Sequence, residues 1–180
     1  MDIRRLRPVE PAVERFIEEL WIPYHVDLGA AVEEHALVEP LARREDDDLL
    51  EGAVEFAMDQ LESVECILWI AVDGASDPYA DLAETDGEFA GYVLCVVQPS
   101  PEPFDSPDRF VIGDLFVREP HRGTGLADSL VDRAVEQAHE EGCQELALDV
   151  DVDNERAMAF YEKRGFEPAR MRMRLPTDAA

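Results

Sequence analysis

Apolar residues in the first third of the chain recur at helical spacing. In residues 11–21 the apolar positions lie three or four residues apart and form one helical face: Val13, Phe16, Ile17 and Leu20. Pro23 is expected to end this helix, because proline lacks a backbone N–H and clashes with the preceding turn. The acidic run 46–48 predicts the start of a second helix, since carboxylates stabilise helix N-termini. A short strand is expected before both helices, around Ile3.

Three apolar segments in the middle of the chain predict strands. Residues 66–72 form an uninterrupted apolar run that predicts a buried strand, and residues 89–97 predict the next strand. The polar, turn-rich stretch 73–87 separates them, which favours an antiparallel pair. A connection with four prolines follows, and residues 110–117 then resume the pattern of a strand.

The clearest helix of the sequence lies in residues 126–141, where apolar residues recur every four positions: Leu126, Leu130, Ala134 and Ala138. Gly142 is expected to end it, because glycine adopts the left-handed conformation found at helix C-termini. Residues 145–150 then alternate like a strand. Strands 110–117 and 145–150 are therefore predicted to be joined by a β-α-β crossover.

The last segment predicts one more helix and one more strand. Asn154 is suited to cap a helix that runs to Arg164, and Gly165 is suited to end it. Three alternating apolar residues suggest a final strand: Met171, Met173 and Leu175. The order of elements predicts one mixed α/β domain over residues 1–180, with its chemistry at the crossover.

Composition adds a strong negative charge. The 180 residues include 42 acidic and 16 basic ones, for a net charge of -26, and Lys163 is the only lysine. Such a surface repels nucleic acid. The acidic residues are spread along the chain, which resembles proteins adapted to molar salt, where the Debye length is about 3 Å. The rival interpretation is that the acidity attracts a polycationic substrate, but the depletion of lysine with arginine retained favours salt adaptation.

Neither cysteine nor histidine shows metal-binding spacing. The three cysteines lack a CxxC pair and are interpreted as reduced packing residues, and no two histidines are four apart, so no metal is predicted. The longest apolar run, 66–72, is too short to span a bilayer, and the N-terminus lacks the pattern of a signal peptide. We therefore expect a cytoplasmic protein that does not enter membranes.

A glycine-containing turn stands between strand 110–117 and the helix that follows. Its sequence is Arg122-Gly123-Thr124-Gly125-Leu126-Ala127. The glycines permit unusual backbone angles, and the helix N-terminus leaves unpaired N–H groups that can bind a diphosphate. A P-loop would need lysine after the second glycine, and a dinucleotide fingerprint would need glycine at Asp128. Taken alone, the turn is equally compatible with an ordinary strand-to-helix connection.

Four features between Phe110 and Phe166 together resemble the GNAT acetyltransferases. They are the strand Leu115-Phe116-Val117, the Arg-x-x-Gly-x-Ala sequence at 122–127, Asn154, and Phe-Tyr-Glu-Lys-Arg-Gly-Phe at 160–166. The resemblance implies a GNAT-type fold with a mostly antiparallel mixed sheet, flanking helices, and a fourth strand that splays from the fifth. It also implies an acyl-CoA-binding core over 108–167 and acceptor-side helices within 1–65.

The resemblance further implies which residues meet acetyl-CoA, the expected cosubstrate. Residues 122–127 would cradle the diphosphate, and Asn154 would contact the pantetheine arm. Backbone groups of three strand residues would pair with that arm: Leu115, Phe116 and Val117. Tyr161 would approach the sulfur and protonate the leaving thiolate, because a tyrosine with a pKa near 10 keeps its proton at neutral pH. Without the family match, Tyr161 would be interpreted as a packing aromatic.

The acceptor amine must lose a proton before its nitrogen attacks the thioester, so a base or a water chain is required. Asp114, on the strand that faces the expected cleft, is the nearest carboxylate, although a role in orienting backbone or pairing with arginine is equally open. His25, His35 or glutamates of the first two helices could serve instead. Tyr24 and His25 are candidate acceptor-binding residues, whereas Trp21 is expected to pack in the core.

The sequence thus predicts an N-acetyltransferase that moves an acetyl group from acetyl-CoA to a primary amine within a ternary complex. The acceptor is expected to be a small-molecule or peptide amine. Gly113 stands where some polyamine-type relatives carry glutamate, which weakens a polyamine acceptor. A non-catalytic acyl-CoA-binding sensor, and an acetyltransferase of protein N-termini or lysines, are the alternatives. A homodimer is also open, because dimers are frequent among family members.

Overall fold

A five-stranded sheet carries the fold, with the strands in the order of the chain. The structure, a computed structural model, describes residues 1–32, 35–103, 106–173 and 175. The strands are β1 (Asp2–Arg5), β2 (Cys66–Asp73), β3 (Glu88–Gln98), β4 (Arg109–Val117) and β5 (Glu145–Leu148). Neighbours from β1 to β4 are antiparallel, whereas β4 and β5 are parallel. The predicted mixed α/β fold with one β-α-β crossover is confirmed.

The chain divides into two units, Met1–Asp149 and Val150–Ala180. The first unit holds the whole sheet and the helices that pack on it. Among the described residues, the second unit holds one helix, α6 (Glu155–Lys163).

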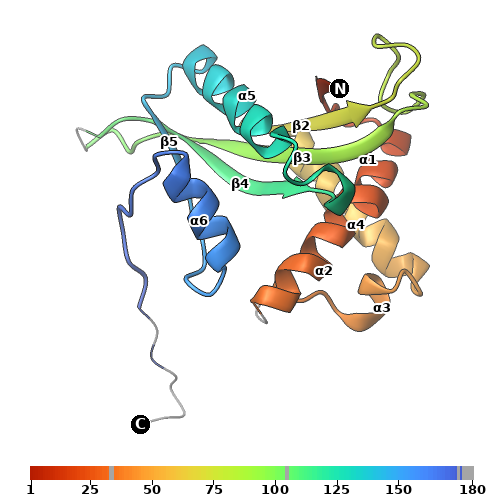
Figure 1. Cartoon of the computed structure of the whole chain (residues 1–180), viewed down its shortest axis with the longest axis horizontal. Helices are drawn as coiled ribbons and strands as arrows, with labels where there is room; N and C mark the ends of the chain where they lie inside the picture. The colour runs from red at the N-terminus through yellow and green to blue at the C-terminus, as the bar shows by residue number, and fades with distance from the viewer. Residues whose placement is uncertain (33–34, 104–105, 174, 176–180) are drawn as a thin grey trace. The chain divides into compact units, whose positions relative to one another are not determined.

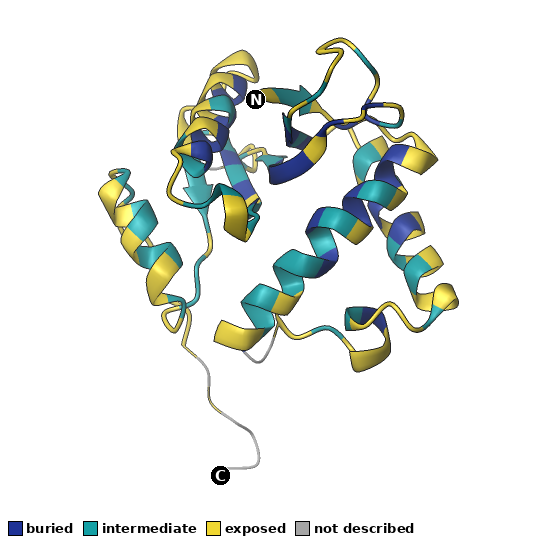
Figure 2. Cartoon of the chain, turned by 45° about the vertical axis from the view of Figure 1, so that its right-hand side comes forward, coloured by how far each residue is buried: buried dark blue, intermediate teal, exposed yellow. Residues whose placement is uncertain are grey.

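Helices cover both faces of the sheet in the first unit. They are α1 (Glu10–Phe16), η1 (Ile17–Trp21), α2 (Ile22–Ala31), α3 (Glu39–Ala42), α4 (Asp47–Glu62), η3 (Glu119–His121) and α5 (Leu126–Glu140). Figure 1 shows α5 on one face and α1 and α4 on the other. Figure 2 shows buried positions along α1, α4 and α5, the helices that pack on the sheet. The ring of Phe16 meets that of Tyr92 edge-on in the core, with their centroids 4.9 Å apart.

The first helix runs through Pro23 instead of ending there. α1 passes into the π-helix η1 and then into α2. The N–H of Ile22 donates to the carbonyl of Ile17, five residues back. This wider turn restarts the α-helix, so Pro23 lies in the first turn of α2, where a missing N–H costs no hydrogen bond. The prediction that Pro23 ends the helix is wrong for this reason.

The predicted starts and stops of the other two long helices are confirmed. The carboxylate of Asp46 accepts a hydrogen bond from the N–H of Leu49 at 3.1 Å and caps α4. After α5, Gly142 adopts φ 74°, the left-handed conformation that ends helices.

In the second unit, the capped helix is confirmed and the final strand is not. The side chain of Asn154 accepts a hydrogen bond from the N–H of Ala157 at 3.2 Å, which starts α6. Residues 171–173 and 175 have no strand conformation, so the predicted strand is wrong for the described residues, and Arg174 lies outside them. Alternation alone does not make a strand, because a strand also needs a hydrogen-bonding partner.

Candidate active site

The glycine turn presents backbone donors at the N-terminus of α5. Gly123 and Gly125 have φ of 74° and 89°, and Gly125 is the N-cap residue of α5. Within the described residues, no backbone acceptor pairs with the N–H groups of Gly123, Thr124 or Gly125. The first turn of α5 adds further N–H groups without intrahelical acceptors and the positive end of the helix dipole. This turn can therefore bind a phosphate group through backbone alone.

The guanidinium of Arg122 faces α2 rather than the glycine turn. Its Nη2 donates to Asp27 at 2.5 Å, and its Nε donates to the carbonyl of Val117 at 2.9 Å. The same group lies 5.9 Å from the centroid of the Phe116 ring. Asp27 of α2 thus pairs with Arg122, the one arginine in the predicted diphosphate-binding segment 122–127. This ion pair connects the start of that segment to the acceptor-side helices.

β4 extends beyond its parallel partner. β5 pairs with Arg109 to Ile112, and Gly113 to Val117 continue past that pairing. Within the first unit, no backbone hydrogen bond of a described residue reaches this β5-side edge from another strand. Leu115, Phe116 and Val117 lie on this edge, although the Val117 carbonyl already accepts from Arg122. The edge has the form of a splayed pair, whose free groups can bind an extended chain.

A β-bulge at Gly113 decides which face of the sheet carries Asp114. Asp114 lies opposite Leu94, whereas Ile112 lies opposite Cys95. Because Leu94 and Cys95 are consecutive, they point to opposite faces, and so do Asp114 and Ile112. A regular strand would place Asp114 and Ile112 on one face. The extra residue Gly113 therefore turns Asp114 toward α1 and α4, on whose side Leu94 packs.

Two tyrosines hold the carboxylate of Asp114. The hydroxyl of Tyr92, which is buried, lies 3.2 Å from its Oδ2 and donates to it, and Tyr24 also hydrogen-bonds to it. Burial raises the pKa of Asp114 above its usual value, and the two hydrogen bonds oppose that rise. Burial, and then the nearby Asp114 charge, raise the pKa of Tyr92 well above its usual value, so its hydroxyl stays a donor.

Asp114 lines a cavity of about 280 Å³ between the sheet and the helices. The apolar wall comes from α1 and η1 (Phe16, Ile17 and Trp21), from α4 (Phe56, Ala57 and Leu61) and from the sheet (Leu68 and Leu94). The polar lining residues are His25, Gln60 and Asp114. A mostly apolar cavity with few polar groups is typical of small-molecule sites.

His25 lies in this cavity as a neutral imidazole at neutral pH. Burial lowers its pKa from 6.5 to about 4, and the charge of His35 contributes to the decrease. Its ring contacts those of Trp21 and Tyr24 edge-on, at centroid distances of 4.3 and 4.9 Å. The structure brings both predicted acceptor residues to Asp114: His25 as a lining residue, and Tyr24 as a hydrogen-bond partner. Trp21, expected in the core, lines the cavity and packs against that core.

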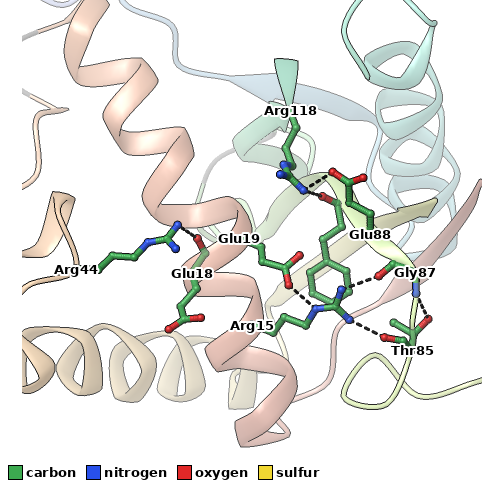
Figure 3. A network of polar contacts seen from close by, with 9 residues as sticks. Arg15, Glu18, Glu19, Arg44, Thr85, Gly87, Glu88 and Arg118 are labelled. Atoms are coloured by element: carbon green, nitrogen blue, oxygen red, sulfur yellow. Dashed lines mark hydrogen bonds and ion pairs between the residues drawn. The ribbon is translucent and has the colours of Figure 1, made fainter. Parts of the chain in front are cut away.

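A second hollow, of about 400 Å³, is lined by charged residues of both signs. They are Glu18, Glu19, Asp27, Arg44, Arg118, Glu119 and Arg122. Figure 3 shows part of this network: Arg118 donates to Glu88 at 2.5 Å, and Arg44 donates to the carbonyl of Glu18. Each of the three arginines there already donates to an acceptor of the protein: Arg44 to Glu18, Arg118 to Glu88 and Arg122 to Asp27.

Beside that hollow, Arg15 fixes α1 to the loop that precedes β3 (Figure 3). It donates to Glu19 at 2.6 Å and to the carbonyls of Thr85 and Gly87 at 2.9 and 2.6 Å. Its guanidinium also lies 4.0 Å from the centroid of the Phe89 ring. These contacts hold the helix that supplies one wall of the cavity.

Comparison with known proteins agrees with this geometry. A sequence model of the acetyltransferase (GNAT) family matches residues 32–166. The chain belongs to the GNAT family. An N-alpha-acetyltransferase of Arabidopsis thaliana is 36% identical over 85 residues, which cover 47% of this chain and 43% of that protein. The chain therefore spans less than half the length of that curated relative.

Solved structures show the same GNAT fold. A protein from Bacillus halodurans superposes with a TM-score of 0.66 at 19% identity, over 98% of this chain and 99% of that chain. An aminoglycoside N-acetyltransferase in complex with CoA superposes with a TM-score of 0.62 at 18% identity, over 98% and 93% of the two chains. At these identities the likeness concerns the fold.

The two GNAT residues of the second unit lie on its helix. Asn154 is the N-cap of α6, and its side-chain oxygen is engaged with Ala157. Tyr161 lies within α6, with its ring 5.3 Å from that of Phe160 and 5.4 Å from that of Phe166. Asn154 thus has a structural role at the helix start, which leaves its amide N–H groups for any further contact.

Three residues of the candidate site were not predicted from the sequence. Tyr92 orients Asp114 from β3, and Phe56 and Gln60 of α4 line the cavity. Tyr92 sits in an apolar strand, where its hydroxyl needs a buried partner, and that need was the available signal. Nothing in the pattern of α4 indicates that Phe56 and Gln60 line a cavity rather than the surface.

Across 1–32, 35–103, 106–173 and 175, no three His, Cys, Asp or Glu side chains gather as metal ligands. In the same residues, no helix has both the length and the apolar character to cross a membrane.

Proposed function

We propose that the protein transfers an acetyl group from acetyl-CoA to a primary amine within a ternary complex. One observation carries the proposal. A bulge in β4 turns the half-buried carboxylate of Asp114 into a cavity. The free edge of the same strand leads to the glycine turn of α5. A proton acceptor, an amine-sized cavity and a phosphate-binding turn thus occur within one unit.

The first unit supplies the groups that acetyl-CoA requires. The glycine turn and α5 offer backbone N–H groups for the diphosphate, and they do so without lysine. The free edge from Gly113 to Val117 offers amide and carbonyl groups for the amide-containing pantetheine arm. Arg122 would add its charge to the diphosphate only after releasing Asp27.

The amine binds beside Asp114 as an ammonium and must lose a proton to react. The carboxylate, oriented by Tyr92 and Tyr24, accepts that proton directly or through a water. The amine nitrogen then forms a bond to the thioester carbonyl carbon, and the carbon–sulfur bond breaks. The amine loses its second proton and the thiolate gains one, so the products are the N-acetyl amine, CoA and the proton that Asp114 returns to solvent. Proximity within the ternary complex supplies much of the acceleration.

Two residues of the second unit complete the proposal, and the likeness of their segment to other GNAT sequences supports it. Tyr161 donates a proton to the leaving thiolate, since a tyrosine of ordinary pKa is protonated at neutral pH. Asn154 contacts the pantetheine arm through its amide.

The similarity to an N-alpha-acetyltransferase supports a second candidate acceptor, the N-terminal amine of a peptide. A non-catalytic acyl-CoA sensor is the third. Every assay should therefore include a peptide with a free N-terminus as well as small amines. A sensor would bind acetyl-CoA, but no amine would stimulate the release of CoA.

The test compares the native protein with Tyr161→Phe in about 1 M KCl, which screens the surface charge. Acetyl-CoA binding is measured by calorimetry, and amine-stimulated CoA release by a thiol assay. Equal binding with release slowed about 10²-fold or more in Tyr161→Phe supports the proposal. Tyr79→Phe, an exposed tyrosine, is the matched control and should behave as native. Binding without release from any amine indicates the sensor, and absence of binding refutes the proposal.

A further inference from the structure

We infer that the acceptor is a primary monoamine carried on a small, uncharged, apolar body. The inference rests on the proposed function and specifies its acceptor. It follows from the wall, the charge and the size of the cavity that holds Asp114.

The wall of the cavity is apolar on three sides. Trp21 belongs to η1, Phe56 and Leu61 belong to α4, and Leu68 belongs to the sheet. Hydroxyl or amino groups of an acceptor placed against these side chains would lose their water without gaining hydrogen bonds, which is unfavourable. The wall therefore selects an acceptor whose body is aliphatic or aromatic.

The charge of the cavity complements one ammonium. Asp114 is the only carboxylate among the described lining residues, and His25, the only histidine among them, is neutral at neutral pH. Glu18 and Glu19 of η1 and Asp27 of α2 line the second hollow, which shares no described lining residue with the cavity. An ammonium beside Asp114 would be paired, and a second one inside the cavity would have no counter-charge.

The size of the cavity suits a small acceptor group. Its volume of about 280 Å³ lies near the lower end of the range of small-molecule sites, about 300–1,000 Å³. A pentyl or phenylethyl group is small enough for such a cavity. A polycationic, hydroxyl-rich acceptor such as an aminoglycoside conflicts with both the wall and the charge.

The deciding experiment compares two amines of equal length that differ in one charge. Pentylamine and 1,4-diaminobutane have the same number of non-hydrogen atoms, and the second replaces a methyl group by an ammonium. CoA release and the acetylated product are measured with acetyl-CoA in about 1 M KCl. The inference predicts a kcat/KM for pentylamine at least about 100-fold above that for 1,4-diaminobutane.

Two sources of such an amine are distinguished in the same assay. Pentylamine and 2-phenylethylamine represent a free small molecule, and a peptide that begins with leucine represents an N-terminal residue with an apolar side chain. A higher kcat/KM for the free amines assigns a small-molecule acceptor, and a higher value for the peptide assigns a protein N-terminus. Both outcomes agree with an apolar monoamine.

Engineered variants test the location of the site. Leu61→Glu adds a carboxylate to the cavity wall and should shift the preference toward 1,4-diaminobutane by about tenfold or more. Leu49→Glu makes the same change in α4 outside the lining and should leave the preference unchanged. If Leu61→Glu does not fold, Ala57→Leu serves instead. The larger side chain fills part of the cavity and should slow the acetylation of pentylamine more than that of ethylamine.

The results separate the inference from the function on which it rests. Preference for 1,4-diaminobutane, spermidine or an aminoglycoside, with normal CoA release, overturns the inference and leaves the acetyltransferase in place. Absence of release from every amine overturns the acetyltransferase, and the inference with it.

Discussion

The hydroxyl of Tyr92 on β3 donates to the carboxylate of Asp114 on β4 at a distance of 3.2 Å. This contact exists because the bulge at Gly113 brings Asp114 to the face of the sheet that carries Tyr92 and Leu94. Tyr92 is buried and cannot turn to solvent, so it fixes the position of the Asp114 carboxylate. Among the described residues that line the cavity, Asp114 is the only carboxylate. The proposed proton acceptor is thus held by the core of the sheet rather than by a loop.

Tyr92→Phe should raise the pKa of Asp114. The hydrogen bond from Tyr92 stabilises the charged carboxylate, so its removal makes the carboxylate easier to protonate. The acid limb of the pH profile of kcat/KM should therefore move to higher pH, and the free energy of unfolding should fall by about 1–3 kcal/mol. Tyr79→Phe, at an exposed position, provides the control. An unchanged acid limb in Tyr92→Phe would show that Asp114 does not control the rate.

His25 should make the protein less stable in mild acid. Its pKa is lowered from 6.5 to about 4, so the unfolded chain binds a proton that the folded chain rejects. The stability that neutral His25 contributes is complete above pH 6.5 and is lost progressively as the pH falls to about 4. Urea unfolding between pH 7.5 and 4 should show a smaller loss in His25→Gln than in the native protein. His139→Gln, exposed on α5, should lose stability as the native protein does.

The glycine turn and the helix stop provide a matched pair of alanine substitutions. Gly125 and Gly142 have φ of 89° and 74°, and a Cβ at either position meets no atom within 4 Å. Each alanine should therefore destabilise the fold by about 1–2 kcal/mol through the backbone conformation alone. Only Gly125→Ala should also weaken acetyl-CoA binding, because Gly125 belongs to the proposed diphosphate site and Gly142 lies at the other end of α5. Equal acetyl-CoA affinity in both variants, measured by calorimetry, would contradict that site.

We propose that the acidity of the chain is an adaptation to high salt. A net charge of -26 over 180 residues repels itself in dilute buffer, and salt screens this repulsion. The thermal midpoint should rise steadily from 0.1 to about 2 M KCl in calorimetry. An equal concentration of sorbitol gives no ionic screening and serves as the control. A midpoint that does not change with KCl would refute the adaptation.

Local chemistry made much of the fold predictable. The apolar runs at 66–72, 89–97 and 110–117 became strands, and Asp46, Gly142 and Asn154 cap or end helices as their side chains and backbone permit. Pro23 failed as a helix stop because a single π-turn, which leaves no mark in apolar spacing, moved it into the first turn of a new helix.

The candidate site was less predictable, because it depends on contacts distant in sequence. Asp114 could be named from its strand, but its face is set by a bulge whose only sign was Gly113. The pairing of Arg122 with Asp27 joins residues far apart in the chain, and no spacing rule indicates it. The cavity is lined by residues of four helices and three strands, so its lining could be identified only from the packed structure.

The most direct test of the account is the pH dependence of pentylamine acetylation by the native protein and by Asp114→Asn. The amide cannot accept a proton, so kcat/KM should fall by about 10²–10⁴-fold, and the acid limb of the native profile should disappear. Acetyl-CoA affinity, measured in parallel, should be unchanged. A variant that acetylates pentylamine at the native rate, with the native acid limb, would show that Asp114 is not the proton acceptor and would contradict the account.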